Sequence, residues 1–156
     1  MKEYTKILSA EPSNPVIDIL ADLLSGKGGE LNAIHQYFFQ YVMTSDMELK
    51  KLFKHLMMEE MKHAELIADS ILAFGGIPYL CNHFNKFFST DFLDYSLSEK
   101  EFVLNNIKDE EFAIKSYNNA IEQVDNESLK KLLGEIRDDE LNQLDELKKQ
   151  LERFEN

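Results

Sequence analysis

The sequence of 156 residues is poor in the residues that cross-link or interrupt a chain: it has one cysteine, three prolines, six glycines and no tryptophan. A single thiol, Cys81, excludes an intrachain disulfide and is typical of a reducing cytosol, so we expect a cytoplasmic protein. Proline and glycine are the strongest helix breakers, and their scarcity favours long helices.

Long apolar runs and positive charge are scarce as well. No run approaches the ~20 apolar residues that a membrane span needs, and we expect no signal peptide in the first residues. The formal net charge is −12 at pH 7. Phosphate groups would be repelled, so we predict no nucleic-acid or anionic-membrane partner, whereas cations would be attracted.

Apolar residues recur at helical spacing along four long segments. The first begins at Asn14 and Pro15, which are expected to be the N-cap and first helical residue, and it reaches about Thr44. The glycines at 26, 28 and 29 leave open whether this segment is one helix or two. The other three segments cover about 46–74, 98–124 and 127 to the C-terminus, with capping boxes expected at Ser45 and Ser98.

The connections between these segments predict the topology. Short turns make the first pair and the second pair of helices antiparallel. The irregular stretch at 77–97 can cross a helix ~40 Å long, so the second and third helices are expected to be parallel. We therefore predict an all-α, up-down four-helix bundle with a long crossover. Residues 1–14 would form an N-terminal extension and residues 15–156 the bundle domain.

Acidic residues interrupt the apolar stripe of every helix. A buried carboxylate without a partner costs several kcal/mol, and two divalent cations would neutralise four of them. Glu60 and His63, three residues apart, share one helix face and match half of a dinuclear iron or manganese site. For any single glutamate an exposed position is the commoner explanation, but the coincidence on four helices favours metal. The inward polar set is Glu30, Glu60, His63, Glu110, Glu140 and Gln143.

The last helix allows a second alignment, shifted by one residue, in which Asp139 and Asn142 replace Glu140 and Gln143. The heptad-like spacing of the surrounding leucines favours Glu140 and Gln143.

These residues resemble bacterioferritin and its relatives in the ferritin-like superfamily over about residues 15–150. The second-helix motif EMKHAE at 60–65 is the most specific part. Weaker matches are ELNAIHQYF at 30–38, ILAFGGIP at 71–78, the glutamate and Ala-Ile around 110–114, and DELNQLD at 139–145.

The resemblance implies a ferritin-like fold with a ferroxidase site. Glu30, Glu110 and His63 would be terminal ligands, and Glu60 and Glu140 bridging ligands. Ferrous iron would be oxidised by O₂ or H₂O₂ and stored as ferric mineral. Iron is the expected metal, with manganese or another divalent ion as alternatives.

The sequence departs from the family at three points. Gln143 stands where the family has a second histidine, so the metal position next to Glu110 is predicted to bind less tightly. Met61 stands where bacterioferritins place a haem-binding methionine, which makes haem b a candidate cofactor, although methionine is more often a packing residue. No counterpart of the family's short fifth helix follows, so the expected homo-oligomer ranges from a dimer to a cage of twelve or twenty-four subunits.

Two smaller features have ordinary explanations beside functional ones. His55 and Glu59 resemble an inner-surface iron site of the family, yet an exposed polar pair is commoner. Cys81 could be redox-active, but a lone cysteine is usually a packing residue.

Two further functions stay open. The chain could be a catalytically weakened or structural subunit, because of Gln143. It could also be a small di-metal oxidase or peroxidase, similar to rubrerythrin or manganese catalase; the lack of a cysteine-rich module counts against a full rubrerythrin.

Overall fold

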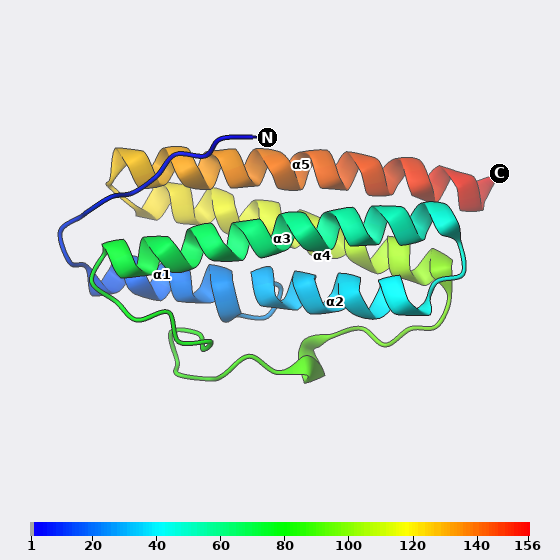
Figure 1. Cartoon of the computed structure of the whole chain (residues 1–156), viewed down its shortest axis with the longest axis horizontal. Helices are drawn as coiled ribbons and strands as arrows, with labels where there is room; N and C mark the ends of the chain where they lie inside the picture. Colours follow the sequence, from blue (N-terminus) through cyan, green and yellow to red (C-terminus); the bar gives the residue numbers. More distant parts are fainter. Residues whose placement is uncertain (1) are drawn as a thin grey trace.

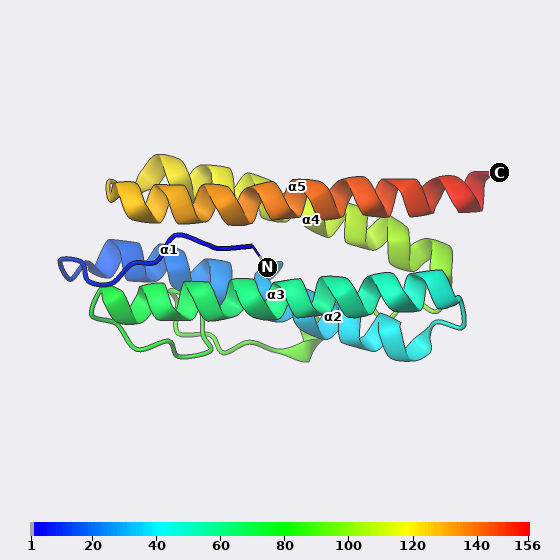
Figure 2. The same ribbon diagram turned by 45° about the horizontal axis from the view of Figure 1, so that its top comes forward.

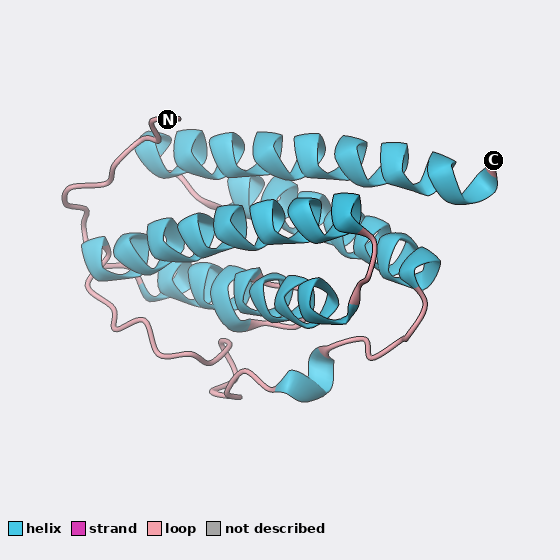
Figure 3. Ribbon diagram, turned by 45° about the vertical axis from the view of Figure 1, so that its right-hand side comes forward, coloured by secondary structure: helices cyan, strands magenta, loops and turns pink. Residues whose placement is uncertain are grey.

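The computed structural model describes residues 2–156, and the regular structure in that range is helical apart from one β-bridge between Cys81 and Phe87 (Figures 1 and 3). The helices are α1 (Asn14–Ser25), α2 (Glu30–Met43), α3 (Met47–Ala73), α4 (Glu99–Gln123) and α5 (Glu127–Glu155), with a 3₁₀ turn at Thr90–Phe92. Helices α1 and α2 lie end to end as one rod, so four rods form the predicted all-α bundle (Figure 1).

The crossover runs along the whole bundle, so α3 and α4 are parallel as predicted (Figure 1). It is fixed to the first rod at two places. The backbone N–H of His83 donates to Asp22 Oδ1 at 2.9 Å, and Gln36 and Asp94 exchange two hydrogen bonds of 2.9 and 2.7 Å. The crossover therefore belongs to the packed structure.

Two helix caps differ from the sequence prediction. Ser13, rather than Asn14, caps α1, and Asp46, rather than Ser45, caps α3. Asp46 Oδ1 accepts from the N–H groups of Glu48 and Leu49, because a carboxylate is the stronger acceptor for these unpaired donors. The cap predicted at Ser98 is confirmed by its bond from the Glu101 N–H.

The first rod contains two helices because the glycines between them adopt conformations that other residues avoid. Gly28 has φ +75°, and a Cβ on Gly29 would lie 2.6 Å from the carbonyl oxygen of Leu23. The chain turns aside there and resumes helical geometry with Glu30 as the first residue of α2. The break thus places a carboxylate at a helix N-terminus.

The core consists of two apolar clusters. One contains Leu20, Ile67 and Ile136, and the other contains Phe53, Phe102 and Leu147. On α3, Glu60 and His63 lie in sequence between the residues of the two clusters, and on α5 the same holds for Asp139, Glu140 and Gln143, which places a polar layer inside the bundle. Between residues 2 and 156, no helix has both the length and the apolar character needed to cross a membrane.

Candidate metal centre

The polar layer contains all six side chains that the sequence assigned to the inside of the bundle. Each is at most 4% exposed: Glu30 from α2, Glu60 and His63 from α3, Glu110 from α4, and Glu140 and Gln143 from α5. One ligand atom from each of four of them lies within 4.8 Å of the others; the four are Glu30, Glu60, His63 and Glu140. Of the shifted pair on α5, Asp139 is buried as well but Asn142 is exposed, so only Glu140 and Gln143 both point inward.

His63 is fixed between two groups of acids. Its Nδ1 lies 2.9 Å from Glu140 Oε1 and 3.4 Å from Glu60 Oε2. Its Nε2 lies 3.2 Å from Asp139 Oδ2 on the opposite side of the ring. A carboxylate that holds one ring nitrogen of a histidine leaves the other for a metal, so Nδ1 is the candidate ligand atom.

Two buried tyrosines each hold a carboxylate from another helix of the bundle, and these two carboxylates, Glu30 and Glu110, are called the outer carboxylates below. The Tyr117 hydroxyl donates to Glu30, and the Tyr37 hydroxyl donates to Glu110. Each tyrosine follows a glutamate on its own helix by seven residues, or two turns, yet bonds to the glutamate of the other helix. Neither tyrosine was predicted from the sequence to support the centre. The repeated seven-residue spacing is the signal that could have identified this role.

Burial and mutual repulsion keep protons on this cluster. Burial raises the pKa of Glu30 and Glu140 well above their usual range, and the charge of Glu60 raises both further. Burial raises the pKa of Glu110 to about 8. Burial would raise the pKa of Glu60 too, but the hydrogen bond and charge of His63 together with other hydrogen-bonding neighbours, Glu30 among them, lower it. Divalent cations would have to displace several of the retained protons, as metal binding to acidic ligands generally does.

The pKa of Asp139 is shifted in the opposite direction, below its usual value. Burial alone would raise its pKa, but hydrogen bonds from His63, Lys2 and Tyr4 lower it to about 2. In turn, carboxylates around His63, Asp139 first among them, overcome burial and raise the pKa of the imidazole well above its usual range. A metal ion at Nδ1 would replace a proton on a ring that Asp139 holds in place.

Unpaired buried atoms provide the test of whether this chain fits a metal. Among the described residues, five buried atoms of the layer make no hydrogen bond of good geometry: Glu60 Oε1, His63 Nδ1, Glu140 Oε1 and both amide atoms of Gln143. His63 Nδ1 and Glu140 Oε1 lie 2.9 Å apart, but their contact is an ion pair and lacks the alignment of a hydrogen bond. Each unpaired buried polar atom costs about 1–3 kcal/mol. Four of the five are carboxylate, amide-oxygen or imidazole atoms of the kind that Fe²⁺ and Mn²⁺ bind once a retained proton is displaced, so the residues fit a dinuclear centre.

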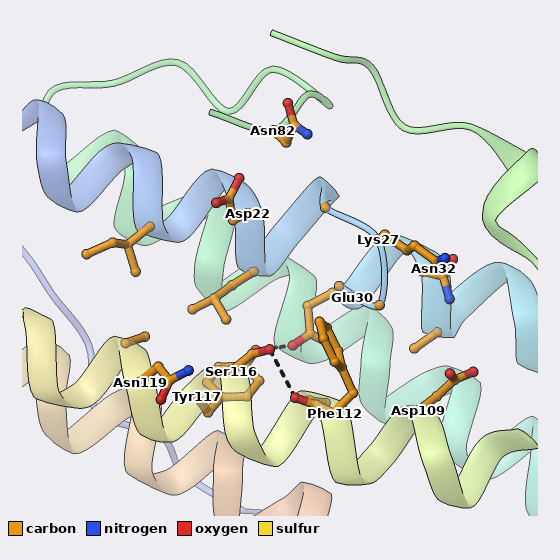
Figure 4. Close-up of a pocket in the computed structure, with 18 of the residues that line it drawn as sticks. Asp22, Lys27, Glu30, Asn32, Asn82, Asp109, Phe112, Ser116, Tyr117 and Asn119 are labelled. Atoms are coloured by element: carbon orange, nitrogen blue, oxygen red, sulfur yellow. Dashed lines mark hydrogen bonds between the residues drawn. The ribbon is translucent and has the colours of Figure 1, made fainter. Parts of the chain in front are cut away.

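A cavity of about 400 Å³ reaches the centre from the surface (Figure 4). Its inner end is lined by Glu30, Glu60, Glu110 and Glu140, and the glycines between α1 and α2 form part of its wall. Asp22 and Asn82 lie towards the outside (Figure 4). Burial and the nearby Asp94 raise the pKa of a further lining residue, Asp109, to about 6. The wall therefore carries carboxylates at both ends, at Asp22 and at the buried glutamates, with apolar residues such as Leu23 and Phe112 between them.

A model of the ferritin-like domain family matches residues 20–156. The chain belongs to this family. The solved structures agree with the assignment: a manganese catalase from Anabaena superposes with a TM-score of 0.90 over 99% of this chain and 79% of its own, at 20% identity.

Two bacterioferritins also share the ferritin-like fold. The Rhodobacter capsulatus protein, described with a metal-free dinuclear site and haem iron, has a TM-score of 0.80 at 25% identity and covers 94% of this chain and 89% of its own. The Desulfovibrio desulfuricans protein, described with a diiron site, has a TM-score of 0.74 at 26% identity, covering 91% and 81%.

A curated sequence relative is a probable manganese catalase from Clostridium acetobutylicum. It is 36% identical over 70 residues, which is 44% of this chain and 31% of that protein. The chain thus matches about a third of the length of this relative.

The other residues for which the sequence suggested a function lie outside the buried polar layer. Met61 is half exposed on α3, and its role as a haem ligand stays a prediction. His55 Nε2 lies 3.6 Å from Glu59 Oε2 in a partly exposed pair, in keeping with the simpler reading. Cys81 is buried in the crossover.

Gln143 gives a direct test of whether the two proposed metal positions differ in affinity. An imidazole is a stronger ligand than an amide, so Gln143→His is expected to raise the affinity for the second metal ion by at least ~10-fold. Calorimetric titration of the metal-free protein with Mn²⁺ should show two unequal steps that become more alike in the variant. Two equal steps in the wild type would contradict the asymmetry.

Proposed function

We propose that this ferritin-like chain is a dinuclear-metal oxidoreductase that oxidises ferrous iron with O₂ or peroxide and passes the ferric product to storage. The observation that supports it best is the buried layer of four carboxylates and one imidazole with unpaired ligand atoms. Such a layer is costly without cations, and it lies at the inner end of a cavity whose lining includes the carboxylates of Asp22 and Asp109, which a cation could follow.

The residues divide into two metal positions that share the middle carboxylates. Glu30 and His63 would hold one ion, Glu110 and Gln143 the other, and Glu60 and Glu140 would bridge them. Bound ferrous ions supply the electrons that reduce the oxidant. The chain itself aims the ligands: Tyr117 and Tyr37 fix the two outer carboxylates, and the apolar clusters on either side exclude bulk water.

A second candidate is peroxide disproportionation at a dimanganese centre. The local identity with a probable manganese catalase and the fold shared with the Anabaena manganese catalase over nearly the whole chain favour it. The weaker ligand Gln143 favours a third candidate, a structural subunit without turnover that assembles with an active partner.

Kinetics on the purified, untagged homomer separate the three. Stopped-flow absorbance should show iron oxidation faster than in buffer after Fe²⁺ is mixed with O₂ or H₂O₂. Oxygen release from H₂O₂ by the Mn²⁺-loaded protein, without accelerated iron oxidation, would support the catalase. If neither rate exceeds that of buffer, the structural subunit is favoured. Light scattering then shows whether the homo-oligomer is large enough to enclose a mineral.

The cavity is the proposed route for iron and oxidant. Ala113 lines it, and Ala113→Leu would fill part of its volume without altering a ligand. We expect the initial rate of iron oxidation to fall by roughly 5- to 10-fold while the bound metal content stays unchanged, since access alone is narrowed. Lys115→Leu, on an exposed position of α4, is the control. Equal rates for both variants would exclude this route.

A further inference from the structure

The N-terminal segment, residues 2–13, has no regular secondary structure and runs alongside α3 and α5 (Figures 1 and 2). It is tied down at several points. The Thr5 N–H and hydroxyl donate to the Glu135 carboxylate at 2.8 and 2.9 Å, and the Ser13 N–H donates to the Phe74 carbonyl at 3.3 Å. The side chains of Tyr4 and Ile7 pack on the apolar cluster beneath.

The far end of this segment reaches the residue that holds the histidine of the metal centre. Lys2 Nζ lies 2.5 Å from Asp139 Oδ1, and the Tyr4 hydroxyl donates to Asp139 Oδ2 at 2.6 Å. The same Oδ2 lies 3.2 Å from His63 Nε2. The Tyr4 ring also stands edge-on to the imidazole, with ring centres 6.3 Å apart.

We propose that the N-terminal segment positions the metal centre from outside the bundle: Lys2 and Tyr4 fix the Asp139 carboxylate, which aims His63 Nδ1 at the bridging glutamates. The inference rests on the proposed metal centre but not on which reaction that centre performs. Lys2 and Tyr4 are positioning residues, since their side chains hydrogen-bond to Asp139 and Glu135, and only the ring of Tyr4 packs on a proposed ligand, His63.

The geometry explains why two donors are needed. A carboxylate that accepts only from an imidazole can rotate about its side-chain torsions, and the imidazole then follows. With one oxygen held by an ammonium and the other shared by a phenol and an imidazole, the Asp139 plane is fixed. Groups that orient a ligating histidine in this way typically change metal affinity by roughly 10- to 100-fold when removed.

The test uses Lys2→Met, Tyr4→Phe and the double variant, with any tag at the C-terminus so that Lys2 keeps its position. Tyr4→Phe removes one hydroxyl and keeps the ring that packs on the core. Lys6→Met is the matched control, because it removes the same charge from an exposed position of the same segment. Each metal-free protein is titrated with Co²⁺, and the visible absorption of the bound ion reports its ligand geometry.

We expect the double variant to bind Co²⁺ roughly 10- to 100-fold more weakly, with a shifted absorption spectrum and a changed pH profile of binding. Tyr4→Phe should show a smaller change of the same kind, and Lys6→Met should match the wild type. Wild-type affinity and spectrum in a folded double variant, or in Tyr4→Phe if the double variant does not fold, would overturn the positioning role alone. A wild-type protein that binds no Co²⁺ would overturn the proposed centre as well.

Discussion

Glu140→Gln is expected to abolish tight binding of both metal ions and, at the same time, to make the metal-free protein harder to unfold. Glu140 is 2% exposed and lies between His63 and the other carboxylates, with its pKa raised by burial and by the charges of Glu60 and Glu110. Glutamine keeps the shape but cannot ionise. A bridging ligand is lost, and so is a carboxyl group that the metal-free protein can bury at pH 8 only by retaining a proton.

Two measurements on the same preparation check both halves of this expectation. Metal analysis after gel filtration should show almost no retained Mn²⁺ or Fe²⁺, whereas thermal unfolding in chelator at pH 8 should shift upward by several degrees. Glu152→Gln, an exposed change on the same helix, should alter neither value. A Glu140→Gln protein that retains the wild-type metal content would remove Glu140 from the ligand set.

The metal-free protein is expected to lose stability as the pH rises from about 5 to 8.5. The folded-state pKa of Glu110, about 8, exceeds the usual value of 4.5 because of burial. Its contribution is therefore fully present at low pH and is lost as the pH rises through 8. At about 1.4 kcal/mol per pKa unit, this carboxyl alone accounts for a change on the order of 5 kcal/mol.

The other shifted groups of the centre mostly act in the same direction. The raised pKa values of Glu30, Glu140 and His63 likewise give stability that fades as the pH rises. Asp139 has the opposite sign, but its pKa is lowered to about 2, so its contribution is lost only below about pH 4. The groups with raised pKa values therefore determine how stability changes between pH 5 and 8.5.

Calorimetric melting temperatures in chelator at several pH values provide the measurement. Bound Mn²⁺ should reverse the trend, because it requires the deprotonated ligands. Glu110→Gln should flatten the metal-free profile. A metal-free melting temperature that is constant or rises between pH 5 and 8.5 would show that the carboxylates do not share a buried site.

The rods and the inward positions of the six polar residues were predictable, because burial imposes a helical period that the sequence shows directly. Glu140 and Gln143, for example, follow from the spacing of leucines on α5. The caps were misplaced by one residue at Ser13 and Asp46, since neighbouring residues of similar capping ability compete and only the backbone geometry decides between them.

The hydrogen bonds that hold the ligands of the centre in place were less predictable, because they join distant parts of the chain. Lys2 and Asp139 are separated by 137 positions, and an extended segment has no period that would show where it docks. The pairing of Tyr117 with Glu30 likewise crosses 87 positions. Such contacts follow from the packed bundle, and a local pattern in the sequence does not encode them.

The break between α1 and α2 has a consequence for how Glu30 can respond to a change of charge in the centre. The first amides of a helix have no carbonyl partner one turn earlier, so the opening turn can reorient without breaking the ladder behind it. Glu30 stands at that opening turn, whereas Glu60, Glu110 and Glu140 are anchored in mid-helix. Of the four carboxylates, Glu30 thus has the backbone held by the fewest helical hydrogen bonds, and the hydrogen bond from Tyr117 is what fixes its side chain.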